Sequence, residues 1–279
     1  MSAWLEVHRV SKTFASGVLF RRSRHEAVRD VSFALQSGEA LAIVGQSGSG
    51  KSTLARMIVG LIEPTSGEIM LRGQPVRRRT AKERLDAAKR LQMIFQDPFE
   101  AMNPNQQVGT LIARPLQLHG YEGDVRQRAL ELLRKVGLTP AEDFVSKFPH
   151  QLSGGQRQRV MIARALAVEP EAIVADEPTS MLDVSIGIDI MNLLLDLKDE
   201  FNLSLIWITH NLASARYMAD RIMVMKDGSV VETGDVEEVI GRPRHPYTKQ
   251  LLLASPDPRR ERAEPQAASA ADSPAPPAR

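Results

Sequence analysis

Gly45-Gln46-Ser47-Gly48-Ser49-Gly50-Lys51-Ser52 is the stretch that decides the fold of this chain. The apolar segment before it, Leu41–Val44, predicts a strand, and Lys51–Val59 predicts a helix with an apolar face. Glycines between a strand and a helix let successive backbone N–H groups curl around an anion at the positive end of the helix. The run therefore predicts a phosphate-binding loop in an α/β domain. The alternative is a chance glycine-rich turn between a strand and a helix.

Side chains at the end of this loop add charge and oxygen ligands. Lys51 supplies a positive charge for the β and γ phosphates of a nucleotide. The hydroxyl of Ser52 suits Mg²⁺, because this cation prefers oxygen ligands. The loop residues predicted to contact ATP are Gly45, Gln46, Ser47, Gly48, Ser49, Gly50, Lys51, Ser52 and Thr53.

Two carboxylates, Asp176 and Glu177, close a second apolar run, Ala172–Ala175, which predicts a buried strand of a parallel sheet. In P-loop enzymes the first carboxylate holds Mg²⁺, and the second orients the attacking water or accepts its proton. We expect these roles for Asp176 and Glu177. The alternative is a solvent-facing acidic pair before the turn at Pro178.

Two more polar side chains follow apolar segments that predict strands. His210 comes after Ser204–Thr209, and Gln96 comes after Leu91–Phe95. Because ligands bind at the carboxyl ends of strands in open α/β sheets, we expect both side chains near the γ-phosphate. Each residue alone is ambiguous, since a single histidine is more often structural than catalytic.

A second glycine-rich segment, Leu152-Ser153-Gly154-Gly155-Gln156, lies far from the first. Ser153 stands where the N-cap of a helix over Gly154–Ala167 is expected, so this helix also offers a positive end and free N–H groups to an anion. The alternative is an ordinary capped helix. One ATP needs only one such loop, and we therefore predict that two copies, or this chain and a relative, share their nucleotides.

These segments together make the chain resemble the ATP-binding subunit of ABC transporters from Leu5 to about Ala254. Gly45–Thr53 resembles the Walker A segment, Leu152–Gln156 the signature, and Ile173–Glu177 the Walker B segment with its catalytic glutamate. Gln96, Ser180–Asp183 and His210 resemble the Q-loop, the D-loop and the switch histidine, respectively. The resemblance implies an α/β fold: a RecA-like P-loop NTPase core with an antiparallel β subdomain and an α-helical subdomain.

The resemblance also implies a set of functional residues. Glu177, His210 and Gln96 would be catalytic, and Ser52, Gln96 and Asp176 would hold Mg²⁺. Further contacts to ATP, some of them to the ATP held by the partner subunit, would come from Phe14, Ser153, Gly154, Gly155, Gln156, Asp176 and Asp183.

Two positions depart from the usual pattern of the family. Met181 stands in the D-loop where a small residue is commoner, which leaves Asp183 in place. Phe14 stands where a tyrosine often stacks on adenine, so the aromatic face is kept and the hydroxyl is lost. The alternative for Phe14 is a core residue of the N-terminal sheet.

Composition favours one large globular domain over residues 1–254, in which the resemblance implies a helical subdomain at about 97–170. The 279 residues are 43% hydrophobic and contain no cysteine, which excludes disulfides and thiolate metal sites. No signal peptide or run of 18 apolar residues is seen, so we expect no membrane span. The whole chain has a net charge of only +2, and the basic run Arg77–Arg79 predicts a solvated face, the alternative being a contact with anionic lipid or nucleic acid. Residues 255–279 predict a disordered tail.

Two segments resemble the oligopeptide and dipeptide importer group, which also serves nickel and other solutes: Arg244–Leu252, within a C-terminal segment of about 235–254, and Asp97–Pro104. The resemblance implies a subunit at the cytoplasmic face of the inner membrane that powers peptide import by ATP-driven dimerisation. Its implied partners are a second ATPase, with a heterodimer favoured over a homodimer, two transmembrane permeases and, indirectly, an extracytoplasmic solute-binding protein. The alternatives are import of nickel or a glycoside, an exporter subunit, and a soluble ABC ATPase that acts on DNA or ribosomes.

Overall fold

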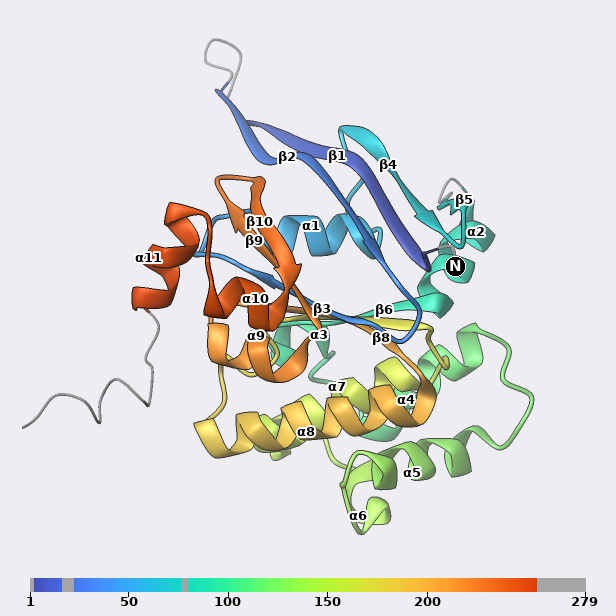
Figure 1. Cartoon of the computed structure of the whole chain (residues 1–279). Helices are drawn as coiled ribbons and strands as arrows, with labels where there is room; N and C mark the ends of the chain where they lie inside the picture. Colours follow the sequence, from blue (N-terminus) through green and yellow to red (C-terminus); the bar gives the residue numbers. More distant parts are fainter. Residues whose placement is uncertain (1–2, 17–22, 77–79, 255–279) are drawn as a thin grey trace, which may run out of the picture.

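The computed structural model describes residues 3–16, 23–76 and 80–254. The basic run predicted as a solvated face and the tail predicted to be disordered lie outside these residues. The described chain folds as two sheets with helices between and below them (Figure 1).

A six-stranded sheet forms the centre of the molecule, with the order β10-β9-β3-β8-β7-β6. All neighbouring pairs are parallel except β9 and β10. Every residue of β3, β7 and β8 is buried, which explains why these strands read as continuous apolar runs in the sequence. The strands are β3 (Ala40–Val44), β6 (Leu91–Ile94), β7 (Ala172–Asp176), β8 (Ser204–Thr209), β9 (Arg221–Lys226) and β10 (Ser229–Asp235).

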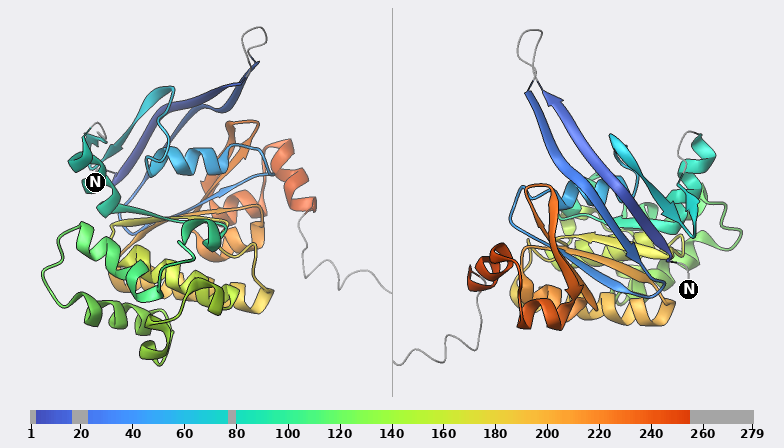
Figure 2. Two further views of the ribbon diagram at one scale, coloured as in Figure 1. Left: turned by 180° about the vertical axis from the view of Figure 1, so that it is seen from behind. Right: turned by 45° about the horizontal axis from the view of Figure 1, so that its top comes forward.

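A smaller antiparallel sheet, with the order β2-β1-β4-β5, covers one side of the molecule. Its strands are β1 (Leu5–Ser16), β2 (Ser23–Leu35), β4 (Ser66–Leu71) and β5 (Gln74–Pro75). Helix α1 (Lys51–Ile58) lies between the two sheets (Figures 1 and 2), and its Leu54 and Ile58 are fully buried there. The antiparallel β subdomain that the resemblance implied is thus present.

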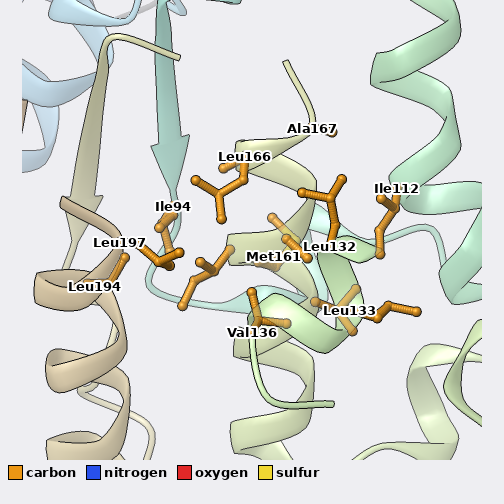
Figure 3. Close-up of a cluster of buried hydrophobic side chains, with 14 of the residues drawn as sticks. Ile94, Ile112, Leu132, Leu133, Val136, Met161, Leu166, Ala167, Leu194 and Leu197 are labelled. Carbon is orange, nitrogen blue, oxygen red and sulfur yellow. The ribbon is translucent and has the colours of Figure 1, made fainter. Parts of the chain in front are cut away.

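Helices inserted between β6 and β7 pack around α7 (Gly154–Leu166). Figure 3 shows Ile112 of α4, Leu132 of α5 and Met161 of α7 in one apolar cluster that continues to Ile94 of β6. Helix α7 therefore joins this helical region to the central sheet. The inserted elements are α3 (Pro98–Ala101), α4 (Val108–Leu118), α5 (Val125–Lys135), α6 (Ala141–Val145) and the 3₁₀ turn η1 (Pro149–Gln151).

Sequence reasoning missed helix α2 (Ala81–Arg90), which follows the predicted solvated face. Its start carries a readable signal, because Thr80 and Glu83 form a capping box with bonds of 3.1 and 3.0 Å. The remaining helices are α8 (Val184–Phe201), α9 (Leu212–Met218), α10 (Val236–Gly241) and α11 (Pro246–Ala254). Within the described ranges, none of the helices has the length and apolar character needed to cross a membrane.

A pair of leucines in α4 tests the packing of the helical region. Leu116 is fully buried, so Leu116→Ala should lower the free energy of unfolding by about 2–5 kcal/mol, since it leaves a cavity. Leu118 in the same helix is 56% exposed, and Leu118→Ala should change stability by less than about 0.5 kcal/mol. Urea unfolding followed by circular dichroism compares the two, and equal losses would contradict the packing described.

Candidate functional site

Four neighbouring strands place the predicted site residues at one edge of the sheet. The phosphate-binding loop follows β3, His210 follows β8, Asp176 ends β7 with Glu177 directly after it, and Gln96 follows β6. These segments surround a cavity of about 700 Å³. The residues that line it are Phe14, His25, Ala27, Gln46, Ser47, Gly48, Gly50, Lys51, Ser52, Thr53, Gln96, Glu177, His210, Leu251 and Ala254.

The loop after β3 has a shape that only glycine permits at two positions. Gly50 has a φ of +100°, and a Cβ there would come within 2.3 Å of the carbonyl oxygen of Ala27. A Cβ at Gly45 would come equally close to the carbonyl oxygen of Met225. The loop therefore packs closely against β2 and β9. It leads into the start of α1, where the positive end of the helix stabilises an anion.

Lys51 is an almost completely buried ammonium at the floor of the loop. Its Nζ donates hydrogen bonds to the carbonyl oxygens of Gly45 at 2.8 Å and Gln46 at 3.0 Å, and lies 4.0 Å from Oε1 of Glu177. Burial lowers the pKa of Lys51, while Glu177 and Asp176 act in the opposite direction. A buried cation beside a glycine-rich loop at the start of a helix makes this site well suited to phosphate.

Ser52 and Asp176 bring two oxygen atoms together below the cavity. The hydroxyl of Ser52 donates to Oδ1 of Asp176 at 3.1 Å, and Asp176 is only 4% exposed. Burial raises the pKa of Asp176, a rise that the hydrogen bond from Ser52 opposes. A hydroxyl and a buried carboxylate are hard oxygen donors, so this pair fits Mg²⁺.

Glu177 is held in a rare backbone conformation with a φ of +45°. The N–H of Glu177 donates to the carbonyl oxygen of Ile208 at 3.0 Å, and the carbonyl oxygen of Glu177 accepts from the hydroxyl of Ser180 at 3.0 Å. Its carboxylate lies 3.1 Å from Nδ1 of His210. Such strain is commonly found at functional sites. The side chain lies at the cavity, within reach of Lys51 and His210.

The second glycine-rich segment lies away from this cavity. Ser153 and Gln156 form a capping box at the start of α7. The N–H of Gln156 donates to the hydroxyl of Ser153 at 3.3 Å, and the N–H of Ser153 donates to Oε1 of Gln156 at 3.0 Å. Gly155 packs closely on α8, where a Cβ would lie 2.6 Å from Ile186. Neither Ser153–Gln156 nor Asp183, the N-cap of α8, is among the residues lining the cavity.

The cavity wall also includes one further predicted residue, Phe14, and several residues that sequence reasoning missed. Phe14 is 42% exposed and lines the cavity, so it is not a core residue of its sheet. His25 stands opposite Phe14 on β2, and Leu251 and Ala254 come from α11. No local pattern marks these three positions, because only packing between distant segments brings them to the site.

Comparisons with known proteins agree with this geometry. The profile of a family described as "ABC transporter" matches residues 28–180. A second profile, described as "Oligopeptide/dipeptide transporter, C-terminal region", matches residues 231–277. The second match begins on β10 and takes in α10 and α11, so it includes the helix that reaches the cavity.

Individual relatives cover most of the chain. The oligopeptide transport ATP-binding protein OppF of Haemophilus influenzae is 47% identical over 242 residues, which span 85% of this chain and 72% of OppF. The dipeptide transport ATP-binding protein DppF of the same organism is 40% identical over 252 residues, 88% of this chain and 76% of DppF. A solved dimer of the ATP-binding cassette MJ0796 with ADP and Pi has a TM-score of 0.74 and 34% identity, and covers 83% of this chain and 98% of its own.

The raised pKa of Asp176 predicts how Asp176→Asn changes stability with pH. The folded chain favours the protonated form of Asp176. Its contribution to the free energy of unfolding is therefore fully present below the ordinary pKa of 3.8 and is lost as the pH rises through the raised pKa of the folded state. Asparagine is neutral throughout and can still accept the hydrogen bond from Ser52. We expect Asp176→Asn to be more stable than the parent at pH 7, with the difference shrinking toward pH 4 in urea unfolding without nucleotide. A difference independent of pH would contradict this.

Proposed function

The chain belongs to the ABC transporter family of ATP-binding proteins, and on that premise we propose that it powers the import of oligopeptides or dipeptides through a membrane transporter. The predicted fold class is confirmed, and as an ABC ATPase the chain binds and hydrolyses ATP. The observation that carries the peptide assignment is the match of residues 231–277 to the C-terminal region of oligopeptide/dipeptide transporters. Relatives named for oligopeptide and dipeptide transport support it.

The phosphates of ATP bind to the loop Gly45–Thr53 in this proposal, with Lys51 facing the β and γ phosphates. Mg²⁺ would be held by the oxygens of Ser52, Asp176 and Gln96, and when bound it neutralises the charge that develops on the phosphates. Phe14 would stack on the adenine, since its exposed ring lies on the cavity wall.

Glu177 is the proposed acceptor of the proton from the attacking water. Its carboxylate lies at the cavity, and the 3.1 Å contact with His210 Nδ1 fixes its orientation. His210 and Gln96, at the ends of the two flanking strands, would contact the γ-phosphate and the water. Hydrolysis then needs only positioning and charge stabilisation from the protein, as is general for phosphoryl transfer.

The signature segment would serve the ATP of a partner subunit. The start of α7 does not line the cavity of its own chain, and neither does Asp183. The residues at this helix start are Ser153, Gly154, Gly155 and Gln156. A related cassette of known structure is dimeric. Two subunits, with a heterodimer favoured, would therefore close head to tail around two ATP molecules, and loss of the γ-phosphate would release them.

The remaining partners follow from the proposed transport function. The domain over residues 1–254 would sit at the cytoplasmic face of the inner membrane, beneath two permeases, and its helical subdomain, about 97–170, would receive the membrane partner. A solute-binding protein outside the membrane would act only indirectly, and nucleic acid would have no part in the cycle. The C-terminal segment at about 235–254 carries the features typical of the peptide group.

Replacing Glu177 by Gln tests the enzyme and its cargo together. The variant should bind ATP normally and hydrolyse it about 100- to 10,000-fold more slowly, because the proton acceptor is lost. Cells that carry it in place of the natural chain should lose uptake of labelled oligopeptides. Glu169→Gln, at an exposed position outside the cavity, serves as the control. Full turnover would remove Glu177 from the mechanism, and loss of nickel uptake alone would refute the peptide assignment.

Ser153→Asp tests the shared site while keeping the helix cap. Aspartate caps helices as well as serine does, but its charge would face the γ-phosphate of the partner's ATP. Light scattering compares the Glu177→Gln variant with the double variant that also carries Ser153→Asp, with the paired ATPase present where one is needed. With ATP, the first protein should form dimers and the double variant should stay monomeric. Thr80→Asp, which also places an aspartate at a helix N-cap, that of α2, should leave the dimer intact. Dimers in all three proteins would contradict a shared site.

A further inference from the structure

One hydrogen bond joins the phosphate-binding loop to the far end of the described chain. The backbone N–H of Gln46 donates to the hydroxyl oxygen of Tyr247 at 3.0 Å, across 201 positions of sequence. Tyr247 lies in α11 and is 5% exposed. We propose that α11 is part of the ATP site: Tyr247 positions the phosphate-binding loop, and the same helix face forms one wall of the nucleotide cavity. This rests on the proposal that the cavity holds ATP.

The start of α11 is firmly attached to the central sheet. The carboxylate of Glu232, on β10, accepts hydrogen bonds from the backbone N–H groups of Arg244 at 2.8 Å and His245 at 3.1 Å. Nδ1 of His245 then accepts from the N–H of Tyr247 at 3.1 Å. The first turn of the helix is thereby fixed, and with it the position of the Tyr247 hydroxyl beside the loop.

The ring of Tyr247 is held as well as its hydroxyl. It belongs to an apolar cluster with Val44 of β3 and Val224 of β9, and Nζ of Lys226 lies 5.1 Å from the ring centroid. Val44 is the last residue of β3, directly before the loop. The tyrosine therefore shares an apolar cluster with the end of β3 through its ring and bonds the loop through its hydroxyl, so it is placed to hold the start of the loop.

One face of α11 continues from this contact along the cavity. Tyr247, Leu251 and Ala254 are spaced four and three residues apart, so they lie on one side of the helix. Leu251 is 7% exposed and lines the cavity together with Ala254. Leu253, between them in sequence, is 66% exposed and is not a lining residue. Figures 1 and 2 show α11 beside the β9–β10 hairpin, on the side where β3 meets α1.

Tyr247 acts through Gln46 rather than on the reaction itself. It is not among the residues that line the cavity, and without its hydroxyl the part-buried N–H of Gln46 would lose this hydrogen bond. Removal of the hydroxyl should therefore loosen the start of the loop and weaken phosphate binding. Proton transfer at Glu177 should be unaffected once ATP is bound.

Tyr247→Phe in the full-length chain tests the positioning role. The apparent KM for ATP should rise about three- to tenfold, as expected for one hydrogen bond, while kcat stays within about twofold. Tyr217→Phe is the matched control, because its hydroxyl also makes one hydrogen bond, to Asn192 on the exposed side of α8. A purely structural tyrosine would lower the melting temperature without nucleotide and leave KM unchanged, which would overturn the proposal.

A second pair of variants tests the wall and does not depend on Tyr247. Ala254→Glu would place a carboxylate in the cavity and should raise the KM for ATP more than about tenfold, whereas Leu253→Glu, one position earlier, should leave it unchanged. Equal KM values for these two variants would overturn the role of α11 even if Tyr247→Phe failed to fold. A parent protein that neither binds nor hydrolyses ATP would instead refute the proposed function, so the two failures are distinguishable.

Discussion

The parallel register of four strands is the constraint on which the whole site depends. Val44 pairs with Thr209, and Asp176 pairs with Ile208, so β3, β7 and β8 end at the same level. The pairing of Ile94 with Ala175 brings β6 to that level as well. Each strand then delivers its polar residues to one edge. Because parallel strands must be buried on both faces, the apolar packing that stabilises the sheet also fixes the geometry of the site.

Within this edge, opposite charges are buried close together, and each changes the behaviour of the other. Burial lowers the pKa of Lys51 and raises that of Asp176, while each charge opposes the shift of its neighbour. Glu177 lies between this pair and His210, at 4.0 Å from Lys51 and 3.1 Å from the imidazole. A site of this kind favours a ligand that brings its own phosphate and cation, since both would relieve charges that the fold has already desolvated.

Two segments connect the edge to the rest of the molecule. Helix α7, whose N-cap is Ser153, packs between the inserted helices and the sheet, so the signature belongs to the helical region. Helix α11 reaches the loop through Tyr247 and lies next to β9 and β10. The nucleotide site is thus in contact with the segment typical of peptide transporters, and the region proposed to receive the membrane subunits packs on the same sheet.

The sequence alone determined the loop, the strand ends and the capped start of α7, because each is a local pattern: glycines before a lysine, apolar runs that end in acids, serine three residues before glutamine. The helix α2 was missed although its capping box was readable. Only the tertiary structure decided that His25 and Leu251 line the cavity and that Tyr247 accepts from Gln46. Those contacts join segments far apart in the chain, and no periodicity records which helix face packs against which loop.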